Sequence, residues 1–193
     1  MKQELKQKIN IEPINIGEIK VGIVGTSSLL MERMSEEVAQ GLIDVMEGRG
    51  RDKRKVRDFK SEVESKIHRT PDGKVGFPTS GFKKSLVASA PYMDGMNMKL
   101  ANSIIIVGYI TPIKYKKQVI NKVIGRDSGR NRSPRPIWRP EFRDWSCELK
   151  VRYNSSLIRP EQIIGLFKLA GFHIGVGGWT PQHSGQYGMF TIK

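Results

Sequence analysis

Hydrophobic and polar residues alternate along several stretches of the chain, and this alternation predicts the strands of a sheet. Residues 145–153 are the clearest case, because all their apolar side chains fall on one face and polar or charged ones on the other. Residues 18–31 begin with the same alternation. Residues 101–110 contain a continuous apolar run, which indicates a buried strand rather than a half-exposed edge. Residues 188–193 predict a short closing strand.

Two segments carry apolar residues at helical spacing and have recognisable ends. The first begins after Ser35 and stops at Gly48. The second begins at Pro160, a residue favoured at the first position of a helix, and ends at Gly171. Both patterns predict helices, and in the second we expect Ile163, Ile164 and Phe167 to face inward.

A further helix is predicted over residues 82–90, ending before Pro91. Either Thr79 or Ser80 can cap it, since a hydroxyl accepts a hydrogen bond from the first free N–H groups of a helix. The side chains predicted to be buried are Phe82, Leu86 and Val87. Residues 70–76 before it are typical of a turn.

The order of these elements predicts the fold class. If the segments 32–75 and 111–143 are set aside, the order is strand, helix, strand, strand, helix, strand. This βαββαβ arrangement is that of the α+β ferredoxin-like or RRM-like (RNA-recognition) fold, an antiparallel sheet with two helices on one face. We therefore expect one domain over residues 1–193, with a helical insertion at 32–75 and a basic loop or hairpin at 111–143.

The net charge indicates which class of partner the protein binds. The 193 residues contain 33 Lys and Arg against 19 Asp and Glu, a net charge of +14. Residues 114–143 hold ten of these cations and two acids, so they supply +8. A surplus of this size favours nucleic acid as the partner. Loops this long are more often functional than not, although a solvated surface loop is the alternative.

Other classes of function are disfavoured by what the sequence lacks. The single cysteine, Cys147, excludes an internal disulfide framework or a multi-cysteine zinc site. No signal peptide or spanning apolar run is evident, so we expect a cytoplasmic protein that does not enter membranes. The three histidines have no metal-ligand spacing, and no paired carboxylates or nucleophile constellation are evident. We therefore expect no metal, no cofactor and no catalytic residue.

A glycine-rich segment precedes the last predicted strand. Five glycines, 175, 177, 178, 185 and 188, fall within fourteen residues. Glycines lack Cβ and adopt positive φ readily, so a polyanion could approach the main chain closely here. The segment matches neither a dinucleotide fingerprint nor a P-loop. An ordinary glycine-rich hairpin is the alternative.

Two motifs resemble the RAMP superfamily of CRISPR-associated proteins. Residues 185–190 (GQYGMF) are similar to its glycine-rich loop, which precedes a strand of a ferredoxin-like core. Residues 76–84 (GFPTSGFKK) resemble the helix start of its crRNA-coating backbone subunits, where small residues and a lysine contact RNA phosphates. The whole sequence also looks like small bacteriophage-encoded proteins. The resemblance implies RNA binding, long insertions between core strands and side-by-side self-assembly.

These observations together predict a binding surface for single-stranded RNA or ssDNA, without catalysis. Its arginines would neutralise phosphates, and an indole such as Trp138 would stack on bases. Trp179 could stack on a base or cap the sheet, and at most one of Lys83 and Lys84 would point at a phosphate. The predicted binding residues are Thr79, Ser80, Lys83, Lys84, Lys116, Lys117, Arg126, Arg130, Arg132, Arg135, Trp138, Arg139, Gly177, Gly178, Trp179 and His183.

Two other functions remain open at this point. One is a metal-independent endoribonuclease of RAMP type, in which His183 would assist RNA cleavage. The other is a phage protein that mimics a subunit of a host defence complex. For the binding function we expect a homo-oligomer, with a host or phage nucleoprotein complex as a further possible partner.

Overall fold

The computed structural model describes residues 13–49, 58–126 and 133–193. Its centre is a four-stranded antiparallel sheet in the order β4-β8-β1-β9. β1 (Ile16–Gly25) and β8 (Ser146–Asn154) pair along nearly their whole length, with Val21 opposite Leu149. β9 (Phe190–Ile192) extends the sheet beside β1, and β4 (Ile105–Ile106) beside β8. The α+β class with antiparallel sheets is confirmed.

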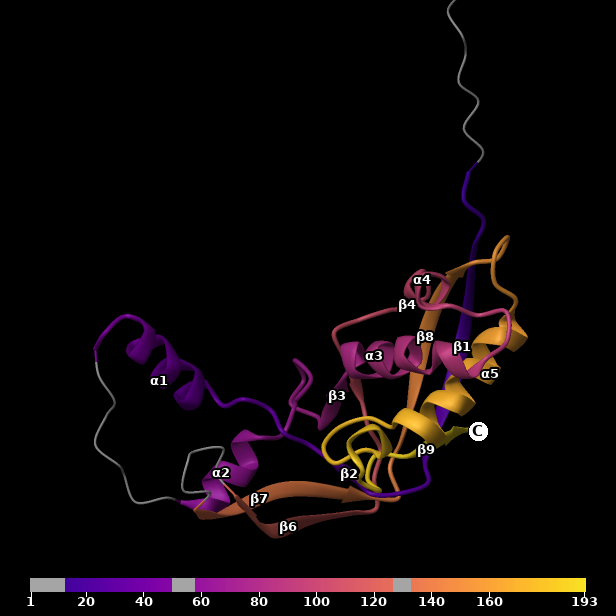
Figure 1. The fold of residues 1–193 in the computed structure, drawn as a ribbon. Coiled ribbons are helices and arrows are strands. Elements are labelled where there is room, and N and C mark those ends of the chain that lie inside the picture. Colours follow the sequence, from indigo (N-terminus) through magenta and orange to yellow (C-terminus); the bar gives the residue numbers. More distant parts are fainter. Residues whose placement is uncertain (1–12, 50–57, 127–132) are drawn as a thin grey trace, which may run out of the picture.

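Two helices, α3 (Thr79–Ser89) and α5 (Pro160–Leu169), pack together against the sheet (Figure 1). Alternation along β1 and β8 places Val21, Ile23 and Leu149 in the core with Phe82 of α3 and Phe167 of α5. Trp145, which precedes β8, is fully buried, as a core position requires. Burying side chains of this size contributes about 1.5–3 kcal/mol each.

The other face of the sheet is polar. Glu18 of β1 pairs with Lys150 and Arg152 of β8, at 2.7 and 2.8 Å, and Lys20 lies 3.7 Å from Glu148. The two hydrogen bonds to Glu18 lower the pKa of its carboxyl. Neither β1 nor β8 presents an exposed aromatic side chain on this face, so it offers no stacking platform for bases.

The predicted strand over 101–110 is largely wrong. Residues Met98–Asn102 form a helix, α4, and only two residues form β4, at the edge of the sheet. Ile104 is fully buried, but Ile105 is 58% exposed. The apolar run therefore divides between the core and the surface, and Gly108, at φ +95°, then turns the chain toward β5 (Ile110–Pro112). β5 pairs with β3 (Gly76–Pro78) in a separate two-stranded sheet.

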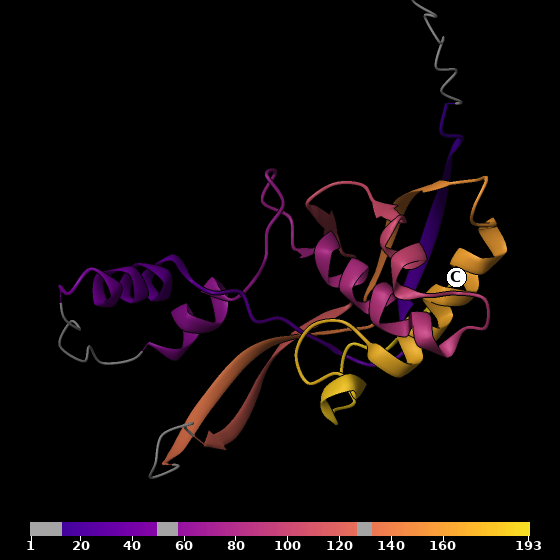
Figure 2. The same ribbon diagram turned by 45° about the horizontal axis from the view of Figure 1, so that its top comes forward.

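The basic insertion is a long hairpin that projects from the core (Figure 2). β6 (Lys117–Arg126) and β7 (Pro134–Arg143) pair over ten residues each, and β7 also pairs with β2 (Leu29–Leu30). Of the two alternatives expected for this insertion, a basic loop or a hairpin, the structure has the hairpin, with a strand from Pro134 onward. Its prolines at 134, 136 and 140 are an even number of residues apart, so they occupy equivalent positions in the ladder. A strand tolerates proline where the missing N–H does not face a partner.

The insertion before β3 contains the predicted helix and one more. Ser35 caps α1 (Glu36–Met46) by accepting from the Val38 N–H at 3.3 Å. α1 has no buried residue, whereas α2 (Phe59–Ser65) packs on β7. The chain after α5 continues through a short π-helical turn (Ala170–Ile174) and a 3-10 turn (Pro181–His183) before β9. A second 3-10 turn (Ala90–Tyr92) follows α3.

No helix in the described ranges has both the length and the apolar character needed to cross a bilayer.

Candidate nucleic-acid interface

The structure brings the start of α3 and the glycine-rich segment to one cavity. The cavity has a volume of about 370 Å³. Ser80 and Lys84 of α3 line one side of it, and Gly177 and Gly178 line the other. Two motifs that lie nearly a hundred residues apart in the sequence therefore form a single site. Residues 32–75 contribute two further lining residues, Glu32 and His68.

Backbone hydrogen bonds fix the glycine segment in this position. The Gly178 N–H donates to the Leu30 carbonyl of β2 at 3.0 Å, and the Gly188 N–H donates to the Ser28 carbonyl at 2.8 Å. β2 also pairs with β7. The glycine segment that lines the cavity and the basic hairpin are therefore both hydrogen-bonded to β2.

Most glycines of this segment are required by the chain's own packing. A Cβ at Gly185 would lie 1.8 Å from the Trp179 carbonyl oxygen, and one at Gly188 would lie 1.7 Å from that of Val176. Gly177 has φ +87°, and its Cβ would lie 2.4 Å from the Leu30 carbonyl oxygen. Gly178 differs, because its Cβ would make only an ordinary 3.5 Å contact with Leu30. Packing within the chain accounts for the former three glycines, and Gly178 alone among these four is open.

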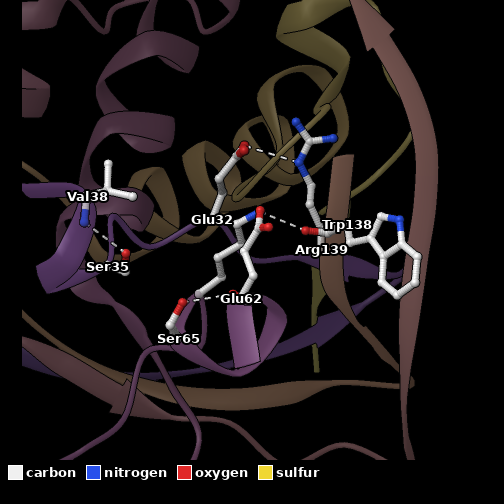
Figure 3. A network of polar contacts seen from close by, with 8 residues as sticks. Glu32, Ser35, Val38, Glu62, Ser65, Trp138 and Arg139 are labelled. Carbon is white, nitrogen blue, oxygen red and sulfur yellow. Dashed lines mark hydrogen bonds and ion pairs between the residues drawn. The ribbon is translucent and has the colours of Figure 1, made fainter. Parts of the chain in front are cut away.

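Arg139 is a structural residue that joins this region to the hairpin. Its side chain is only 8% exposed, and its Nε lies 3.2 Å from Glu32 Oε2 (Figure 3). The guanidinium stands 5.0 Å from the centre of the Trp179 ring, within the range of a cation–π contact. Neither Nε nor Nη1 makes a hydrogen bond to a described residue. The predicted phosphate contact by Arg139 is therefore replaced by an internal ion pair.

Trp138 also has an internal role. Its ring stacks on Phe59 of α2 at 4.4 Å, and the Lys122 ammonium lies 4.4 Å from its centre. Lys66 donates to its carbonyl oxygen at 2.8 Å. Trp138 and Arg139 leave β7 in different directions (Figure 3). The base-stacking role predicted for Trp138 is not supported, because its ring already stacks on Phe59 of α2. Trp179 is 41% exposed and is the better placed of the two indoles.

Thr79 and Lys83 of α3 are also used within the chain. The predicted Thr79 cap is wrong, since Thr79 is already helical and its hydroxyl donates to the Gly108 carbonyl at 2.6 Å. Ser80 is helical as well, and Pro78 occupies the cap position without a side-chain bond. The Lys83 ammonium donates to the carbonyls of Ala101 and Asn102, both at 2.9 Å, and to that of Ile104.

Burial lowers the pKa of Lys83. Lys83 and Thr79 line a second cavity of about 370 Å³ on the other side of Ser80. Because the three carbonyls already use its donors, Lys83 is not available to a phosphate, whereas the neighbouring Lys84 is exposed.

The other predicted cations that the structure describes lie in the hairpin or directly before it. Lys117 and Arg126 are exposed and make no ion pair with a described residue, while Lys116 lies 3.8 Å from Asp144. Arg135 is exposed on β7, and His183 is exposed in a turn, outside the lining of the cavity. Arg130 and Arg132 lie outside the described residues.

Sequence reasoning missed Glu32 and His68. Burial, with a smaller effect of Arg33, lowers the pKa of His68, so the neutral imidazole is favoured at pH 7. Burial raises the pKa of the half-buried Cys147 thiol to about 12, which makes it unreactive. No cluster of three His, Cys, Asp or Glu side chains suited to a metal occurs in the described ranges.

The sheet, the helices that cover it and the long insertions define a RAMP-like fold. Two solved structures resemble the chain. One is a chain of the Type III-B Cmr-beta bound to cognate target RNA, with a TM-score of 0.58 and 13% identity over 93% of this chain. This protein spans 59% of that chain's length. The other is Cmr6 from Pyrococcus furiosus, with a TM-score of 0.48 and 13% identity, covering 94% of this chain and all of Cmr6.

Neither the known protein families nor the curated proteins yield a match to the sequence.

Proposed function

We propose that this protein binds single-stranded nucleic acid, RNA or ssDNA, along its phosphate backbone and does so without catalysis. The observation that carries the proposal is a set of exposed cations, with Lys84 at the cavity and Lys117 and Arg126 on the hairpin. A single strand suits this surface better than a duplex, because none of the described helices projects a basic face of the kind that enters a major groove.

The strand order and the fold neighbour support this function. The core elements β1, α3, β4, β8, α5 and β9 follow the βαββαβ order, and we read them as a ferredoxin-like core. The Type III-B Cmr-beta structure was solved with target RNA bound. For this chain we propose RNA as the first ligand to test, and side-by-side assembly of several copies along one strand.

Binding of a labelled, unstructured oligonucleotide at increasing salt tests the proposal. If about five phosphates are neutralised, the slope of log K against log salt should be near −3.5, from roughly −0.7 per phosphate on single strands. Replacing Lys84, Lys117 and Arg126 together by alanine should flatten this slope and lower affinity at least about tenfold.

A matched control removes the same charge elsewhere. Lys99 of α4, Arg159, which caps α5, and Lys168 of α5 are exposed and belong neither to the hairpin nor to the cavity lining. Their triple alanine variant should bind nearly as the wild type does. A flat salt response, or equal losses in both triple variants, would refute the proposed surface. Intact RNA after incubation without metal is expected, and cleavage would indicate the endoribonuclease instead.

A further inference from the structure

The cavity between α3 and the glycine segment is not built for a phosphate. Its lining includes one carboxylate, Glu32, together with the Ser80 hydroxyl and the His68 imidazole. A phosphate placed here would face the Glu32 carboxylate as well as Lys84, so the lining does not concentrate positive charge as a phosphate site does. Lys84 is exposed, so a phosphate that it contacts can stay in solvent. The backbone therefore belongs outside the cavity.

The half-exposed carboxylate of Glu32 is paired with a buried arginine. Glu32 Oε2 lies 3.2 Å from Arg139 Nε, and the Arg139 guanidinium is buried beneath Trp179. An arginine buried to this extent needs a counter-ion, which keeps the Glu32 carboxylate beside it. Glu32 Oε2 also lies 4.0 Å from where a Cβ of Gly178 would be, so this oxygen stands beside the glycine wall of the cavity. Arg139 Nε makes no hydrogen bond to a described residue, so Oε2 can accept one from a ligand.

The rest of the lining suits a flat ring. Phe77 and Pro78 supply apolar surface, and Gly178 leaves space that a side chain would otherwise fill. The volume of about 370 Å³ falls in the range of small-ligand cavities. Proteins that read single strands take unstacked bases into such sites and bond to their edges.

We propose that this cavity takes one unstacked nucleobase that carries an exocyclic amine, with the amine donating to Glu32. Carboxylates accept from the N4 amine of cytosine in this way. Uracil presents a carbonyl oxygen at the same position, which a carboxylate repels. The inference rests on the proposed function, and it adds base discrimination to a surface that otherwise contacts only phosphates.

Oligocytidylate and oligouridylate of equal length test this at pH 7.5, because both are pyrimidine strands with the same phosphate charge. The wild type should bind oligocytidylate about tenfold more tightly. The salt slopes should be equal, because the phosphate contacts are the same. Glu32→Gln should reduce the preference to less than about twofold, since a carboxamide can donate to the uracil carbonyl.

Glu36→Gln is the matched control. Glu36 lies on α1, outside the cavity lining, with its side chain 96% exposed. This variant should keep the wild-type preference. Glu32→Gln could lower stability by leaving Arg139 without its counter-ion, so the readout is the ratio of the two affinities, which the folded fraction does not change. The rise in melting temperature with each saturating oligonucleotide gives the same comparison independently.

Equal wild-type affinities with a steep salt dependence would overturn this inference and leave the proposed function standing. A preference that persists in Glu32→Gln would also overturn it. Absence of binding to both oligonucleotides would refute the proposed function, and the inference with it.

Discussion

Replacing Gly177 by alanine is expected to destabilise the protein, whereas the same change at the adjacent Gly178 should leave its stability nearly unchanged. Gly177 has φ +87°, where L residues are strained, and its new Cβ would lie 2.4 Å from the Leu30 carbonyl oxygen and 2.9 Å from Leu29 Cδ1. At Gly178 the new Cβ would lie 3.5 Å from Leu30 Cβ, an ordinary contact.

These distances set the expected magnitudes. Strain in the left-handed region costs about 1–3 kcal/mol, and displacing the Leu30 carbonyl adds to this, so about 2–4 kcal/mol is expected for Gly177→Ala. At about 2–4 °C per kcal/mol for a chain of this size, the melting temperature should fall by roughly 4–16 °C. Gly178→Ala should cost less than about 0.5 kcal/mol and shift it by no more than about 2 °C.

Thermal denaturation followed by circular dichroism measures both shifts, and oligonucleotide affinity is measured on the same samples. Gly178→Val, which projects into the cavity toward Glu32, should lower affinity several-fold with a smaller loss of stability than Gly177→Ala shows. Equal destabilisation by the two alanine variants would refute the reasoning about Leu30. Unchanged affinity of Gly178→Val would remove this position from the site.

Two further pairs of variants separate structural residues from binding residues. Trp138→Ala should lose its packing on Phe59 and cost about 2–4 kcal/mol in thermal denaturation, with affinity unchanged, whereas Trp179→Ala should keep the fold and lower affinity about 5- to 50-fold. The melting temperature should fall as the pH drops from 7.5 through 6.5 to 5, because the lowered pKa of His68 means that the unfolded chain takes up the proton more readily. His68→Gln should remove this part of the pH dependence and His183→Gln should not, and an identical pH profile for the two variants would contradict the assignment.

Periodicity predicted the elements that have one buried and one exposed face. The alternation in 145–153 predicts β8, and the helical spacing of apolar residues before Gly171 predicts α5. In both elements the residues that are buried are apolar ones. β4 was predicted too long because an apolar run does not show where the chain turns out of a sheet. The length of β7 could not be predicted, because proline is typical of loops and only its register here makes it compatible with a strand.

The site could be predicted only where it is made of local motifs. The start of α3 and the glycine segment are each recognisable within fewer than fifteen residues, and both do line the cavity. Glu32 and His68 belong to no motif and are brought there by the path of the chain after β2. Glu32 could have been suspected only from its pairing with Arg139, and no sequence pattern connects two residues on separate elements.

The basic hairpin shows why a count of charges does not locate a binding surface. Arg135 and Arg139 are four residues apart on β7, so they share one face of the strand. Arg139 lies close to the core, where β2 and the glycine segment cover it and Glu32 balances its charge. Arg143 is likewise paired with Glu141, at 2.8 Å. Arg126 lies farther from the core, on the opposite strand β6, and no described residue neutralises it in this way. Its charge remains available to a ligand. Distance from the core along the hairpin, more than residue type, therefore decides which arginines can contact phosphate.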